Sequence, residues 1–185
     1  MAKLPIYLYG HPVLRAKASP VAEVTDDLVR LIMNMHETMR HAQGIGLAAN
    51  QVGSLQRVIV IDVSEMEDFQ HIPPMTLINP EVVSSSGSWV IEEGCLSIPE
   101  VRDEEERPET IVVRYRDTSY NLLEIEANSM LARVILHELD HINGVLFLDH
   151  LTRERRALHQ ERLKEIQRGE VDVTYGVVAA SQIPA

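Results

Sequence analysis

Two histidines four residues apart, His137 and His141, stand in an apolar stretch of the chain, and Glu138 directly follows the first. Residues i and i+4 lie on the same face of a helix, so both imidazoles can bind one metal ion. Glu138 is then placed beside a water bound by that metal, where a carboxylate can move protons. The pattern predicts a metal-dependent hydrolase. A purely structural use of the two histidines is the alternative.

A catalytic metal of this kind usually has three protein ligands and one open position. For the third ligand the residues alone leave two sources open. One is upstream: the single cysteine of the chain, Cys95, follows Gly94 in a segment that ends at Pro99, although a lone cysteine is most often an inert buried side chain. The other source is downstream of the helix, where four residues carry suitable atoms: Asp149, His150, Glu154 and His159.

Length and composition favour one domain. The 185 residues are 45% hydrophobic and 24% charged, and we expect a single domain over residues 1–185 with a tail at 170–185 that frays. No apolar stretch is long enough for a membrane helix, and no signal-peptide pattern opens the chain. One cysteine excludes an internal disulfide, so we expect a reducing, cytoplasmic location.

Acidic residues outnumber basic ones, giving a formal net charge of −11, which argues against general binding to nucleic-acid phosphates. Much of the acid lies in one stretch of the chain, which we interpret as a solvated loop. This stretch holds Glu92, Glu93, Glu100, Asp103, Glu104, Glu105, Glu106 and Glu109.

Hydrophobic periodicity indicates strands before the histidine segment. A helix is expected from Thr25 to about Gly44, a buried strand over 57–63 and a loop or insertion over 64–75. A strand over 76–83 should be broken at Pro80. Segments 110–116 and 122–127 should form a hairpin.

The histidine segment itself should be a helix that begins at Asn128 or Ser129 and stops at Gly144. Because apolar residues surround it on most sides, this helix should run through the core. A last helix is expected over 152–168, followed by a short strand over 171–175. The predicted fold is α+β, with antiparallel sheets around a buried central helix that carries the HELDH motif, and with a C-terminal helix.

Three ordered segments resemble the motifs of peptide deformylases: GIGLAANQ at 44–51, EGCLS at 93–97 and HELDH at 137–141. The resemblance implies removal of the formyl group from the N-terminal methionine of newly made proteins, with release of formate. It implies Cys95, His137 and His141 as metal ligands and Glu138 as general base and acid. The side-chain amide of Gln51 and the backbone N–H of Leu96 would form the oxyanion hole. The implied metal in the cell is Fe²⁺, and Zn²⁺, Ni²⁺ or Co²⁺ can occupy such a site.

The resemblance also implies how substrate and partners bind. An N-formylmethionyl nascent peptide would lie as an added strand beside Ile45 and Gly94. We expect Glu93 and Arg133 to pair with other charges. The basic residues of the last helix are interpreted as a solvated surface, and contact of this helix with the ribosome is the alternative that the resemblance implies. The residues expected to bind substrate are Ile45, Gly46, Ile91, Glu93, Gly94, Met130, Arg133 and Val134.

Two other functions fit parts of the pattern. A zincin-like peptidase would cut internal peptide bonds, and a metal-binding scaffold protein would have no activity. Two residues depart from simple expectation. Leu136 stands where the family usually has glutamine, and Asp140 lies near the end of a helix, where an anion needs a cationic partner.

Overall fold

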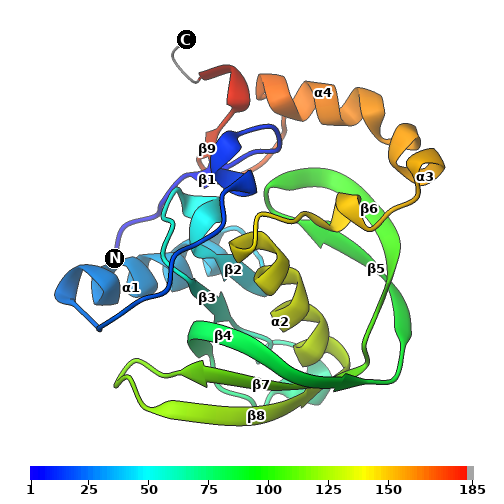
Figure 1. Ribbon diagram of the computed structural model, residues 1–185. Helices are drawn as coiled ribbons and strands as arrows, with labels where there is room; N and C mark the ends of the chain where they lie inside the picture. Colours follow the sequence, from blue (N-terminus) through cyan, green and yellow to red (C-terminus); the bar gives the residue numbers. More distant parts are fainter. Residues whose placement is uncertain (183–185) are drawn as a thin grey trace.

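The helix that carries both histidines, α2 (Ser129–Ile142), crosses the middle of the molecule (Figure 1). The computed structural model describes residues 1–182. Ten residues of α2 are buried, so its predicted place in the core is confirmed. The helix ends at Ile142, and Gly144 follows with φ of +77°, a left-handed conformation that glycine adopts without strain.

One face of α2 packs on a five-stranded sheet with neighbours in the order β2-β3-β4-β7-β8, all antiparallel. On the inner strand β3 the side chains alternate between two cores. Ile59 and Ile61 face α2, whereas Val58 and Val60 join the core of helix α1 (Asp26–His41). The strands are β2 (Gly46–Ala48), β3 (Val58–Ile61), β4 (Met75–Ser86), β7 (Thr110–Arg116) and β8 (Leu122–Asn128).

The predicted helix start at Thr25 and the 110–127 hairpin are confirmed. The Thr25 side chain accepts a hydrogen bond from the backbone N–H of Leu28. The expected break at Pro80 is a bulge instead: β4 runs through it, and its pairing with β7 shifts register between Ile78 and Glu81.

The acidic stretch is not the solvated loop that we expected. It forms an antiparallel hairpin of β5 (Trp89–Cys95) and β6 (Ile98–Arg107), which stands beside α2 (Figure 1). Residues alternate along β6, so Asp103 and Glu105 point inward and are buried. That prediction was wrong because it rested on the acidic composition of the stretch. It did not use the alternation of the charged residues, which has the period of two of a strand.

The C-terminal region also differs from expectation. The single predicted helix over 152–168 is two helices, α3 (Arg153–Leu158) and α4 (Gln160–Arg168), separated at His159. The strand expected over 171–175 is absent from the described residues. Strand β9 (Val177–Val178) instead pairs in parallel with β1 (Ile6–Tyr7).

The predicted fraying of the tail is wrong as far as residue 182. Ala179 is buried, and the tail ends in a 3₁₀ turn, Ala180–Gln182. The rest of that prediction, residues 183–185, lies outside the described residues. Short 3₁₀ turns also occur at Pro12–Arg15, Ala49–Val52, Glu67–Phe69 and Phe147–Asp149. No helix among residues 1–182 has the length and apolar character needed to cross a membrane.

Truncation of the core on α2 tests the packing that holds the histidines. Ile135 is fully buried between α2 and the sheet, so Ile135→Ala should lower the free energy of unfolding by about 2–5 kcal/mol. Leu122→Ala, on a side chain that is 59% exposed, should change it by less than about 0.5 kcal/mol. Urea unfolding measures both. Equal losses would contradict a core centred on α2.

Candidate metal site and active-site cleft

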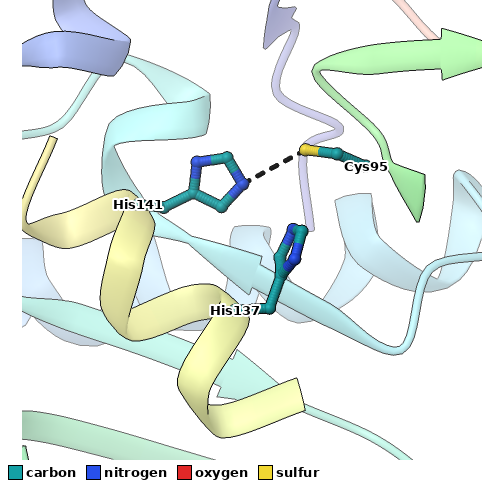
Figure 2. A group of neighbouring side chains, drawn as sticks. All are labelled: Cys95, His137 and His141. Carbon is teal, nitrogen blue, oxygen red and sulfur yellow. Dashed lines mark hydrogen bonds between the residues drawn. The ribbon is translucent and has the colours of Figure 1, made fainter. Parts of the chain in front are cut away.

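Cys95, His137 and His141 converge at one point (Figure 2). The two histidines come from successive turns of α2, and the cysteine comes from the end of β5. Cys95 Sγ lies 3.1 Å from His141 Nε2, and one ligand atom from each of the three residues lies within 4.8 Å of the others. A thiol and two imidazoles are a donor set that suits a divalent transition metal.

The four downstream candidates do not join this group. Asp149 is hydrogen bonded to Arg15, His150 to Asp140, and His159 to Asp103. His150 belongs instead to a second group of possible ligands, with Glu105 and Asp140, and Glu154 belongs to neither group within residues 1–182. Of the two sources that the sequence left open, the structure therefore brings the upstream cysteine to the histidines.

Glu93 fixes the orientation of the first histidine. His137 Nδ1 lies 2.9 Å from Glu93 Oε2. A carboxylate can only accept here, so Nδ1 carries the proton and Nε2 is left with its lone pair toward the cysteine side. Burial alone would raise the pKa of Glu93, but hydrogen bonds from His137 and Arg107 hold that pKa well below its usual value.

Two arginines complete the surroundings of Glu93. Arg107 donates to both of its carboxylate oxygens, Nε to Oε1 at 2.6 Å and Nη2 to Oε2 at 3.1 Å, and Arg133 Nη1 donates to Oε1 at 2.8 Å. All three side chains are at least nine-tenths buried. The prediction that Glu93 and Arg133 pair with other charges is confirmed. Arg133 also donates to the backbone carbonyls of Glu105 and Trp89.

Sequence analysis missed Arg107, which connects Glu93, the hydrogen-bond partner of His137, to Asp140 near the end of α2. Its Nη1 donates to Asp140 Oδ2 at 2.7 Å, and His150 Nε2 lies 2.9 Å from the same oxygen. Asp140 thus has the cationic partner that its position requires. Burial raises the pKa of the neighbouring Glu105 to about 7, although Arg107 opposes this shift. The inward alternation of residues 103, 105 and 107 was the signal that could have found Arg107.

Glu138 lies beside Cys95, His137 and His141 in a buried position. Burial raises its pKa to about 7, and its Oε2 has no hydrogen-bond partner among the described residues. A Cβ atom at Gly46 would lie 2.5 Å from Glu138 Oε1 and 2.7 Å from Val134 Cγ1, so only glycine leaves room for this carboxylate. The close approach at Gly46 is therefore to the side chains of Glu138 and Val134.

The Gln51 amide is held so that its N–H group faces the cysteine. Its Oε1 accepts a hydrogen bond from the Ala48 backbone N–H at 2.8 Å. Its Nε2 lies 3.2 Å from Ser97 Oγ and 3.6 Å from Cys95 Sγ. Ser97 is fully buried, and the sequence reasoning gave it no role. Leu96 and Ser97 form the two-residue turn between β5 and β6.

Asn50 is a second residue to which the sequence reasoning gave no role. It is fully buried, and its Nδ2 donates to the backbone carbonyl of His141. This bond ties the segment that carries Gln51 to the end of α2.

A cavity of about 540 Å³ opens beside this centre. Two strand edges border it, since β2 pairs only with β3 and β5 pairs only with β6 among the described residues. The cavity wall includes Gln51, Cys95, Leu96, His137 and Glu138. It also includes all eight residues expected to bind substrate: Ile45, Gly46, Ile91, Glu93, Gly94, Met130, Arg133 and Val134.

Removal of the Arg107 guanidinium tests the buried charge network that Arg107 forms with Glu93, Glu105 and Asp140. Arg107→Met would leave Glu93, Glu105 and Asp140 without their shared cation, which should cost about 3–5 kcal/mol of unfolding free energy at pH 7. The control Arg114→Met breaks an exposed pair with Glu124 and should cost less than about 1 kcal/mol. Denaturant titration of the metal-free proteins compares the two. Similar small losses would mean that the network contributes no more than a surface pair.

Known proteins are similar to this chain in sequence and in fold. A polypeptide deformylase family model matches residues 3–157. A peptide deformylase of Salinibacter ruber is 49% identical over 95% of this chain and 94% of its own length, and one of Chlorobium phaeobacteroides is 45% identical over 94% of both. The crystal structure of a peptide deformylase from Legionella pneumophila superposes with a TM-score of 0.84 at 34% identity, covering 99% of this chain and all of the other. The chain belongs to the peptide deformylase family.

Proposed function

We propose that this protein hydrolyses the N-formyl group of the first methionine of newly made polypeptides, releasing formate, at the centre formed by Cys95, His137 and His141. The observation that carries the proposal is the position of this three-ligand group. It lies beside the buried carboxylate of Glu138, in a cleft bordered by two strand edges. Membership of the family supports the same activity.

The thiolate of Cys95 and the Nε2 atoms of His137 and His141 would hold one divalent metal. When bound, that ion supplies a Lewis acid that polarises a carbonyl oxygen and makes water a nucleophile at neutral pH. We propose Fe²⁺ as the metal in the cell, with Zn²⁺, Ni²⁺ and Co²⁺ as ions that the site accepts. Sulfur and imidazole donors suit all of these ions, so availability rather than affinity would decide which is bound.

Glu138 would move the protons. Oε2 has no other partner, so this atom is available to take a proton from the attacking water and return it to the amine that leaves. The absence of a side chain at Gly46 leaves room for Oε1 beside β2. Glu138 binds no metal in this scheme, which keeps it available as a base.

Gln51 and Leu96 would stabilise the charge that forms on the formyl oxygen. The Gln51 amide is oriented by Ala48, which leaves its N–H group toward the cleft. The backbone N–H of Leu96 comes from the adjacent turn. Donors that are in place before the reaction contribute about 2.7–4 kcal/mol each to such a transition state.

The peptide would enter as an added strand between the open edges of β2 and β5, bonding through its backbone near Ile45 and Gly94. The methionine side chain would then enter the cavity between Ile91, Met130 and Val134. Because Arg133 is engaged by Glu93, we propose that only its aliphatic part lines this pocket.

Domain organisation and location in the cell are also proposals. We propose that residues 1–185 act as one catalytic domain, which the pairing of β1 with β9 supports, and that the protein works in the cytoplasm. Contact of α3 and α4 with the ribosome stays a prediction. Five of the six basic side chains there already pair with carboxylates, so the helices do not present an unpaired basic face.

Substitution of the proposed base tests the reaction. Glu138→Gln keeps the size of the side chain and removes its basicity, so kcat for formate release from a formyl-Met tripeptide should fall about 10²–10⁴-fold. Glu124→Gln, on an exposed strand residue, should retain the wild-type rate. Formate release unaffected by the first substitution would contradict the role of Glu138 as base, and a wild-type protein without activity would point to the scaffold alternative. Casein cleavage by a protein that releases no formate would point to a peptidase.

Metal removal tests the role of the thiol. Cys95 is the single cysteine of the chain, so a thiol reagent reports on this site alone. In the metal-loaded protein the thiolate should be shielded, and chelation should expose one reactive thiol while formate release stops. A thiol that titrates freely while the metal stays bound would rule out Cys95 as a ligand.

A further inference from the structure

A tyrosine of the C-terminal tail contacts the turn that carries a proposed oxyanion donor. The hydroxyl of Tyr175 donates a hydrogen bond of 2.8 Å to the backbone carbonyl of Leu96. Tyr175 and Val173 also line the cavity that holds Gln51 and Cys95. These tail residues lie beyond residues 3–157, the part of the chain that the family model matches.

Hydrogen bonds hold the turn at both of its carbonyls. Leu96 and Ser97 connect β5 to β6 with no other residue between the paired Cys95 and Ile98. Tyr175 holds the Leu96 carbonyl, and the backbone N–H of Tyr9 holds the Ser97 carbonyl at 2.8 Å. With both carbonyls fixed, the peptide planes on either side of Ser97 have little freedom to rotate. The first of these planes ends at the Leu96 Cα, which is also where the plane of the Leu96 N–H ends, so it limits the directions that this N–H can take.

The tail is itself fixed next to Tyr175. The Ile6 backbone N–H donates to the Gly176 carbonyl at 2.8 Å, and the Leu8 N–H donates to the Val178 carbonyl at 2.9 Å. The Tyr175 side chain packs on the same core as Leu96. Burial raises the pKa of Tyr175 to about 12, so its hydroxyl remains a donor at neutral pH.

We propose that Tyr175 is a positioning residue that sets the direction of the Leu96 N–H toward the reacting formyl oxygen. It acts through the backbone of the turn and does not touch the reacting atoms. The inference rests on the proposed function, because the Leu96 N–H has a role only as an oxyanion donor. A displacement of about 1 Å at such a donor can cost about 10²-fold in rate. Loss of the Tyr175 hydroxyl alone leaves the ring that lines the cavity.

The test is Tyr175→Phe, which removes the hydroxyl and keeps the ring. We expect kcat for a formyl-Met tripeptide to fall roughly tenfold, with KM within about twofold of wild type. Tyr120→Phe is the matched control, since it removes a hydrogen bond of the same type and length, 2.8 Å, to the carbonyl of Val21. The control should keep the wild-type kcat, and both variants should show similar small changes in melting temperature.

The outcomes separate this inference from the proposed function. A wild-type protein that releases no formate contradicts the proposed function itself. An active wild type whose Tyr175→Phe variant keeps its kcat contradicts only the positioning role. A rise in KM without a fall in kcat, or an equal fall in kcat for Tyr120→Phe, also overturns it, because the effect would then come from substrate contact or general stability.

Discussion

Glu93 accepts hydrogen bonds from His137, a proposed metal ligand, and from two arginines in a part of the molecule that excludes most water. An unpaired carboxylate there would be costly, so the two guanidinium groups are needed for Glu93 to stay ionised. An ionised Glu93 in turn fixes the protonated nitrogen of His137 and leaves the other for the metal. Since Glu93 and Cys95 share β5, this interaction also ties the strand to helix α2.

The segments 44–51, 93–97 and 137–141 lie far apart in the sequence and meet at this centre. Close packing positions each of them. The missing side chain of Gly46 leaves space for Glu138, so the β2 edge and the proposed base lie against each other. Gln51 reaches the turn after β5 through Ser97. The tail approaches the same turn through Tyr175. The site thus combines groups whose geometry is fixed before substrate binds, which is what stabilisation of a developing charge requires.

The sequence allowed the central helix, the 110–127 hairpin and the buried β3 strand to be predicted, because each depends on local periodicity. The convergence of Cys95 with the histidines was predicted only through family resemblance, since nothing local distinguishes it from a downstream ligand. Arg107 was missed and β6 was interpreted as a loop. Arg107 and the buried acids of β6 have charged partners on other elements, and such pairing cannot be predicted from composition. The pairing of β9 with β1 was also missed, because it joins segments from the two ends of the chain.

We propose that a thiolate from β5 and two imidazoles from α2 hold one metal. X-ray absorption at the metal edge of the loaded protein tests it most directly, because sulfur and nitrogen neighbours are separately visible. We predict one sulfur at about 2.3 Å and two histidine nitrogens at about 2.0–2.1 Å for bound Zn²⁺. A first shell of nitrogen and oxygen atoms without sulfur would contradict the account.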